Sequence, residues 1–157
     1  MPKITTFLTF DNKAEEAANF YTSLFKNSKI VSSSRYGDAG PGPKGSLMSA
    51  TISLDGQELM LLNGGPSFTF TPGFSLFVSC ESQAEVDDYW SKLTAAGGKP
   101  VQCGWITDQF GVSWQIIPTI LIKLLSDKDP KKAGRVMQAM LTMVKIDVEA
   151  LKNAAEG

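Results

Sequence analysis

The chain has 157 residues and a formal net charge of −1, from 15 basic and 16 acidic residues, and it contains no histidine. Hydrophobic residues make up 43% of the chain, which is ordinary for a globular domain with its own core. The balanced charge shows no basic stripe, so nucleic acid is not an expected partner. Without histidine, the chain lacks the commonest ligand of transition metals.

The apolar segments and cysteines predict a cytoplasmic location and no membrane partner. Apolar runs such as residues 116–122 are too short to span a bilayer, and no signal peptide is expected at the start of the chain. Cys80 and Cys103 are isolated, as is typical of reduced thiols. Cys80 precedes a predicted helix start and is the better nucleophile candidate, but a structural thiol is favoured because no histidine is present to form a Cys–His pair.

The first half predicts a strand, a helix and three more strands, at residues 3–10, 13–25, 28–36, 46–54 and 57–63. Apolar residues at helical spacing mark the helix, and Asp55-Gly56 is a strong hairpin signal. Residues 37–45 hold four glycines and two prolines, which predicts a loop. A mobile flap and a plain surface loop both remain open for it.

After a linker at residues 64–73, the second half predicts elements at residues 74–80, 82–96, 99–106, 112–117 and 119–125, in the order strand, helix, strand, strand, helix. Ser82 and Glu85 have the spacing of a capping box, and Gly97-Gly98 is typical of a helix end. Asp129-Pro130 then predicts one long helix to about Ala155. Its apolar stripe consists of Val136, Met137, Met140, Leu141, Val144, Val148 and Leu151.

The two halves are related by an internal repeat. A shift of 70 residues aligns Phe7 with Phe77, Asp11 with Glu81, Ala14 with Ala84, Glu15 with Glu85, and Phe20 with Trp90. We therefore predict an α+β fold in which two βαβββ modules form curved mixed sheets around a cleft, followed by a C-terminal helix. We expect residues 1–157 to form one domain, with module one at about 3–64, module two at about 73–118 and a C-terminal helical segment at about 119–155.

Three motifs resemble a known superfamily: residues 10–17 followed by Phe20-Tyr21, then Cys103-Gly104-Trp105, and then residues 108–118. Together they resemble the glyoxalase/bleomycin-resistance/dioxygenase, or vicinal-oxygen-chelate, superfamily. Within it, the chain looks like the PhnB-like branch, often labelled 3-demethylubiquinone-9 3-methyltransferase. The resemblance implies a small-molecule ligand in the cleft between the modules and a homodimer.

The resemblance also locates a possible metal site. Superfamily members hold a metal with side chains on the first and last strands of each module, and the positions that match here are Thr5, Met60, Ser75 and Gln115. Only Gln115 offers a plausible ligand for a hard divalent ion, whereas zinc needs about three nitrogen, sulfur or carboxylate donors. We therefore expect no metal and no cofactor.

Aromatic side chains are further candidates for the ligand site. Phe7 and Phe77 occupy equivalent places in the two first strands, where they either join the core, which is favoured, or line the cleft. For Trp105 and Trp114, a core position is likewise favoured over a ligand-stacking role. The predicted ligand-binding set is Thr5, Phe7, Met60, Ser75, Phe77, Trp105 and Gln115.

Polar candidates have structural alternatives. The Gln115 amide either bonds a neighbouring group or orients a ligand. Glu58 and Gln115 are weak candidates for catalytic residues, and Glu58 would serve as a general base. Glu58 lies on the same strand face as Met60 but near the hairpin turn, where exposure to solvent is an equally good interpretation. Asp11 and Asp108 are expected to cap a helix or a turn.

Three functions fit the sequence. The first is a metal-independent enzyme of the PhnB-like branch that acts on or binds a small molecule. The alternative is a non-catalytic protein, like the bleomycin-resistance members, that binds a hydrophobic or aromatic small molecule. The third is a structural dimer module. No S-adenosylmethionine site is predicted, because the first helix opens with Asp-Asn-Lys-Ala and lacks a glycine-rich turn.

Overall fold

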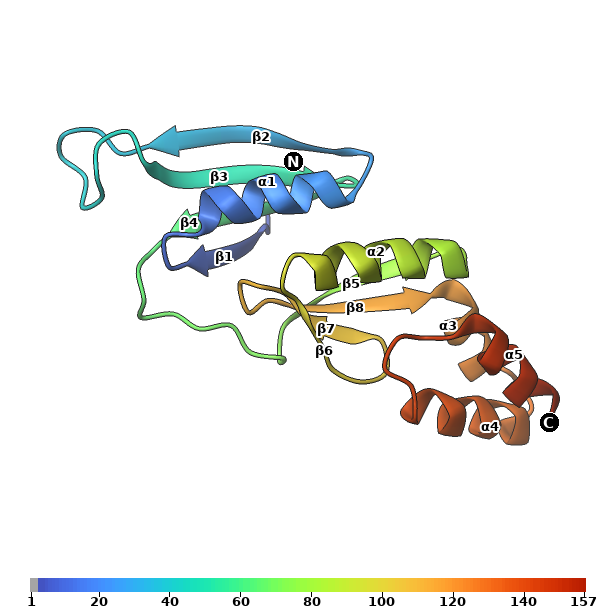
Figure 1. Ribbon diagram of the computed structural model, residues 1–157. Coiled ribbons are helices and arrows are strands. Elements are labelled where there is room, and N and C mark those ends of the chain that lie inside the picture. The colour runs from blue at the N-terminus through green and yellow to red at the C-terminus, as the bar shows by residue number, and fades with distance from the viewer. Residues whose placement is uncertain (1–2) are drawn as a thin grey trace. The chain divides into compact units, whose positions relative to one another are not determined.

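The computed structural model describes residues 3–157. The chain divides into two compact units, one ending at Thr69 and the other running from Phe70 to Gly157. Each unit contains one βαβββ module with a four-stranded mixed sheet (Figure 1). The predicted α+β class and the duplication of the module are therefore confirmed.

The first unit contains β1 (Thr6–Phe10), α1 (Ala14–Leu24), β2 (Ser28–Arg35), β3 (Leu47–Leu54) and β4 (Gln57–Asn63). Its strand order is β1-β4-β3-β2, and β1 runs parallel to β4 while the other pairs are antiparallel. The predicted hairpin joins β3 to β4, with Asp55 at φ 49° and Gly56 at φ 88°. Helix α1 buries the apolar positions that its spacing predicts, namely Ala14, Ala17, Ala18, Tyr21 and Leu24.

Helix α1 begins differently from the expectation that Asp11 caps it. The residue before the helix, Lys13, makes no capping hydrogen bond with its side chain. The amide of Ala14 instead donates to Oδ1 of Asn63, at 2.8 Å. The side chain that starts the helix therefore comes from the end of β4, through tertiary contact.

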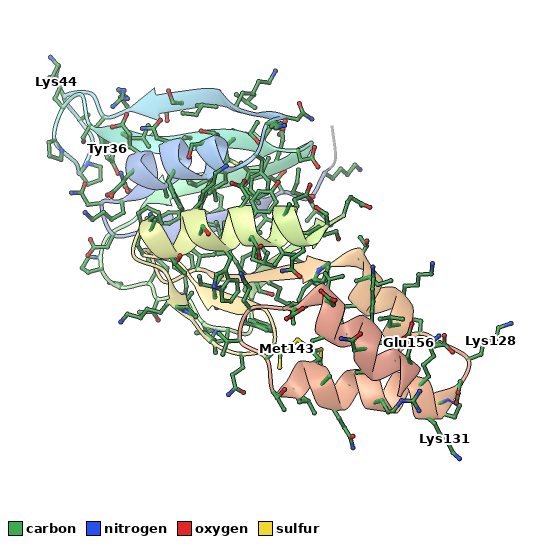
Figure 2. All side chains as sticks on the ribbon, turned by 45° about the vertical axis from the view of Figure 1, so that its right-hand side comes forward. Tyr36, Lys44, Lys128, Lys131, Met143 and Glu156 are labelled. Atoms are coloured by element: carbon green, nitrogen blue, oxygen red, sulfur yellow. The ribbon has the colours of Figure 1, made fainter. Side chains whose placement is uncertain are left out.

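The glycine-rich loop of residues 37–45 packs around Tyr36, which Figure 2 labels together with Lys44. A Cβ atom on either Gly40 or Gly42 would lie 2.4 Å from the Tyr36 ring, so only glycine fits beside it. The Tyr36 hydroxyl donates to the carbonyl of Asn63, at 3.3 Å. These contacts join the loop to Tyr36 and Tyr36 to the end of β4, and the flap interpretation stays a prediction.

The second unit begins with β5 (Ser75–Cys80), α2 (Gln83–Ala95), β6 (Lys99–Pro100), β7 (Trp105–Thr107) and β8 (Ser113–Pro118), and its strand order is β5-β8-β7-β6. The predicted capping box is present, since Ser82 accepts from the Glu85 amide. The single strand predicted for residues 99–106 is wrong. Cys103 and Gly104 adopt left-handed φ values of 56° and 84°, which turn the chain back and split the segment into β6 and β7.

The single long C-terminal helix is also a wrong prediction. The segment folds as α3 (Thr119–Leu125), α4 (Pro130–Leu141) and α5 (Val148–Glu156). Asp147 ends the connection between α4 and α5 by accepting from the Ala150 amide at 3.0 Å, which starts a new helix. These three helices pack around a core of Ile117, Leu121, Val136, Ile146, Leu151 and Ala155.

The predicted apolar stripe therefore divides between two environments. Val136 and Leu151 are fully buried, whereas Met137 and Leu141 are 41% and 56% exposed. Within residues 3–157, no helix combines the length and apolar character that crossing a membrane requires.

Candidate ligand-binding face

The second sheet presents three of the predicted ligand-binding residues in one row. Phe77 on β5 is the register partner of Gln115 on β8, and Gln115 is also the partner of Trp105 on β7. Directly paired residues point to the same face of a sheet, so an amide lies between two aromatic side chains. Their sequence neighbours Ile106, Trp114 and Ile116 are buried on the opposite face. We call Phe77, Gln115 and Trp105 the aromatic–amide row.

The Gln115 side chain is held by Ser75, another predicted site residue. Its Nε2 atom donates to Oγ of Ser75 at 3.0 Å. A primary amide has two N–H donors and one carbonyl acceptor, so this bond commits one donor and fixes the direction of Oε1. The amide is therefore oriented by a side chain on the neighbouring strand.

Exposure distinguishes the aromatic residues that the sequence grouped as core. Phe77 and Phe7 are each 50% exposed, so the favoured core interpretation is wrong for both. Trp114 is 1% exposed and belongs to the core as predicted, while Trp105 is half-buried. Strand alternation explains the difference between the two tryptophans, because they lie on opposite faces.

The first unit repeats the same register. Phe7 pairs with Met60, as Phe77 pairs with Gln115, and Met60 also pairs with Thr51. Thr5 precedes β1, so it lies just outside the strand on which it was placed. Phe7 and Met60 thus form the counterpart row of the first sheet, with no amide in it. The cleft predicted between the modules stays a prediction.

Glu58 is partly exposed and pairs with Ser53, next to the hairpin turn. That place agrees with the solvent-exposed alternative, and it lies in the first unit whereas the aromatic–amide row lies in the second. Its catalytic role stays a prediction.

The donors on the second sheet do not suit a metal ion. Gln115 and Ser75 supply an amide oxygen and a hydroxyl, whereas zinc takes nitrogen, thiolate or carboxylate and magnesium takes carboxylate or phosphate. In the part of the chain that the structure describes, no three Cys, Asp or Glu side chains gather as a metal site would require. We assign no metal chemistry to this face.

Asp108 is a structural carboxylate, as its capping interpretation predicts. It is 4% exposed, and Oδ1 accepts from the amides of Phe110 and Val112 at 2.9 and 3.0 Å. Oδ2 accepts from Nε1 of Trp114 at 2.8 Å. The motif of residues 108–118 therefore closes the turn before β8 and fixes where that strand begins.

Cys80 is buried and unsuited to nucleophilic catalysis. Burial, with smaller contributions from the charges of Glu85 and Glu81, raises the pKa of its thiol to about 12. A thiol with such a pKa stays protonated at neutral pH. This agrees with the structural role favoured from the sequence.

A groove of about 650 Å³ lies away from the row, between α2 and α5. Its wall includes Gln83, Asp87 and Lys145, which bond one another: Gln83 Nε2 donates to Asp87 at 3.0 Å, and Lys145 Nζ lies 2.7 Å from the same carboxylate. These hydrogen bonds, with the charge of Lys145, lower the pKa of Asp87. The sequence showed no signal for this network, because Gln83 and Lys145 lie in different elements and neither belongs to a recognisable motif.

Comparison with known proteins adds the family context. The family model described as 3-demethylubiquinone-9 3-methyltransferase matches residues 2–117. A solved structure from Bacillus cereus, described as a PhnB protein and 3-demethylubiquinone-9 3-methyltransferase, is 48% identical, with 74% of this chain and 98% of that chain covered and a TM-score of 0.67. No curated protein matches the chain.

A more distant structure also has this fold. Protein PA1353 from Pseudomonas aeruginosa is 24% identical, with 73% of this chain and 95% of that chain covered and a TM-score of 0.59. A glyoxylase/bleomycin resistance protein/dioxygenase domain from Frankia sp. EAN1pec is 20% identical over 73% of this chain and 94% of its own. Its TM-score is 0.48. Helices α3, α4 and α5 all lie beyond residue 117, where the family model ends.

Proposed function

This chain belongs to the 3-demethylubiquinone-9 3-methyltransferase, or PhnB-like, family, and from that premise we propose that it binds a neutral, planar aromatic small molecule on the aromatic–amide row. The motifs of the chain resemble the vicinal-oxygen-chelate superfamily. The observation that carries the proposal is the oriented Gln115 amide between Phe77 and Trp105 on one sheet face.

The chemistry of the row selects the ligand class. Aromatic side chains stack on flat rings, and Phe77 is half exposed where an unliganded core residue would be buried. The Gln115 amide supplies an acceptor and a donor, which suit a ring that carries hydroxyl or carbonyl groups. The row itself has no charged residue, which favours a neutral ligand over one that needs an ion pair within the row. The family description names a demethylubiquinone, and a quinol ring has this chemistry.

The proposal is recognition, and no methyl-transfer step is assigned. Helix α2 opens at Ser82 and α1 follows Lys13, so neither helix start has the glycine-rich turn at which adenosyl or dinucleotide cofactors commonly bind. We expect calorimetry with S-adenosylmethionine to give no heat of binding. A measurable heat would instead support the transferase activity that the family description names.

A panel of neutral quinols, phenols and aromatic amides, with aromatic carboxylates for comparison, tests the ligand class. Thermal shift and calorimetry should detect binding of the neutral compounds, because a ligand that binds only the folded state raises its stability. Replacing Phe77 or Gln115 with alanine should weaken binding about tenfold, a loss of about 1.4 kcal/mol.

Phe68→Ala is the matched control, because Phe68 is an exposed phenylalanine (59%) outside the row. It should leave the dissociation constant unchanged. Binding that survives both Phe77→Ala and Gln115→Ala would refute this face as the ligand site. Preferential binding of carboxylates would refute the ligand class.

A homodimer and a cytoplasmic location complete the proposal. The superfamily resemblance supports the first, and the isolated cysteines support the second.

A further inference from the structure

The turn that carries Trp105 is hydrogen-bonded on two sides. On the sheet side, the amide of Ile116 donates to the carbonyl of Gly104 at 2.8 Å. On the other side, the amides of Cys103 and Gly104 donate to the carbonyls of Met143 and Val144, each at 2.8 Å. Met143, which Figure 2 labels, belongs to the connection between α4 and α5.

Packing at Gly104 has no spare room. A Cβ atom there would lie 2.7 Å from Cδ1 of Ile117 and 3.0 Å from Cγ1 of Ile146. Ile117 lies on β8 and Ile146 in the α4–α5 connection, and both belong to the core of the C-terminal helices. The turn is therefore hydrogen-bonded and packed between β8 and the α4–α5 connection. Contacts on both sides stabilise the left-handed backbone at Cys103 and Gly104.

Gln83 fastens that connection to the start of α2. Its Nε2 donates to the carbonyl of Ile146 at 3.0 Å, and its Oε1 accepts from the amide of Val148 at 2.7 Å. Lys145, between Met143 and Ile146, pairs with Asp87 one turn further along α2. Because both polar atoms of the Gln83 amide bond to residues 146–148, this side chain restrains the position of that backbone segment.

We infer that the C-terminal helices are a positioning element for the ligand face, with Gln83 as the positioning residue. Residues 143–148 hold the turn of residues 102–105, which sets where Trp105 stands beside Gln115. Residues 143–148 lie beyond residue 117, where the match to the family model ends, whereas Gln83 and the turn that they hold lie within it. The role in ligand binding rests on the proposed function; the positioning of Trp105 does not.

The decisive experiment follows Trp105 directly. Protein labelled with 5-fluorotryptophan should give one fluorine resonance for each of its three tryptophans, and a Trp105→Phe variant assigns the resonance of interest. In Gln83→Ala, the Trp105 resonance should shift or broaden while those of Trp90 and Trp114 stay in place. Binding of the best neutral quinol from the panel should weaken about tenfold, or about 1.4 kcal/mol.

Lys92→Ala is the matched control, since Lys92 lies on the same helix and its ion-pair partner, Asp88, belongs to that helix too. It should leave both the resonance and the affinity unchanged. If Gln83→Ala leaves the Trp105 resonance in place, the positioning role is overturned.

Amide hydrogen exchange in the unaltered protein provides a test that no unfolded variant can obscure. The amides of Cys103 and Gly104 should be protected to the same extent as those of α4 and α5, because both exchange when the C-terminal helices detach. Rapid exchange of these two amides would overturn the inference. If no quinol binds the unaltered protein, the proposed function fails, while the fluorine and exchange results still decide the positioning of Trp105.

Discussion

At Gln115, a single side chain connects the chemistry of the second sheet to its geometry. A glutamine in an apolar strand must satisfy its amide, and the bond to Ser75 does so while leaving Oε1 as an acceptor. Asp108 has the opposite role. Its carboxylate bonds the turn before β8 and Trp114, so it stabilises the fold.

Asp108→Ala should therefore be strongly destabilising. It leaves the donors of Phe110, Val112 and Trp114 without their carboxylate, and a buried donor that loses its acceptor costs about 1–3 kcal/mol. We expect the free energy of unfolding in urea to fall by about 3–5 kcal/mol. Asp88→Ala removes an exposed carboxylate paired with Lys92 and should change it by less than about 1 kcal/mol. Similar effects for the two variants would contradict the structural role of Asp108.

The two cysteines should differ in reactivity. Burial raises the pKa of the Cys80 thiol to about 12, so at pH 8 only about 1 in 10⁴ molecules carries the thiolate. Cys103 is partly exposed. A thiol-specific chromogenic reagent should modify one thiol of the folded protein and both thiols in denaturant. Fast modification should disappear in Cys103→Ser, and a persistent fast thiol in that variant would contradict the burial of Cys80.

At the scale of elements, side chains from distant segments decide where helices begin and end. Asn63 at the end of β4 accepts from the first amide of α1 and donates from Nδ2 to the carbonyl of Leu47 at 3.0 Å. One residue thereby joins the helix to two strands of its sheet. In the second unit, Gln83 has the corresponding role for the α4–α5 connection.

Asn63→Ala should destabilise the protein by about 1–3 kcal/mol, because it removes a capping bond and leaves the Leu47 carbonyl without its donor. Urea unfolding measures the loss, and amide exchange should show faster opening of the first turn of α1. Asn153→Ala, at an exposed position, should change stability by less than about 0.5 kcal/mol. If Asn63→Ala left the free energy of unfolding unchanged, the capping role would be refuted.

At the scale of the whole molecule, the chain is two compact units with the same βαβββ order, and the second unit carries the additional helices. Several large apolar side chains remain exposed on the described residues, among them Phe7, Phe77, Val31 and Leu141. Exposed apolar area of this kind is commonly covered by a ligand or by another chain.

We therefore predict a homodimer. Size-exclusion chromatography with light scattering should give a mass twice that of the single chain at micromolar concentration. The Leu141→Ser variant tests whether the exposed face of α4 forms part of the dimer interface, since this substitution lies outside the aromatic–amide row. A monomeric mass for the unaltered protein would remove the dimer from the proposed function.

The sequence by itself determined what depends on local chemistry: the strand and helix order of the first unit, the hairpin at Asp55-Gly56, the capping box of Ser82 and the duplication that aligns Phe7 with Phe77. These features follow from side-chain periodicity and backbone preference over a few residues. The repeat and the superfamily resemblance also predicted Gln115 and Ser75 as ligand-site residues, and that role stays a prediction. Tertiary structure decided that they bond each other, because strand register brings together residues far apart in the chain.

Contacts between distant segments also explain the predictions that were wrong. The apolar spacing typical of a helix continues across residues 142–147. There, however, the carbonyls of Met143 and Val144 accept hydrogen bonds from the Cys103–Gly104 turn, and a new helix starts after its cap, Asp147. Phe77 has the hydrophobicity of a core residue, yet its face of the sheet leaves it half exposed. Burial and pairing depend on which surfaces meet in the folded chain, and local sequence patterns do not encode that directly.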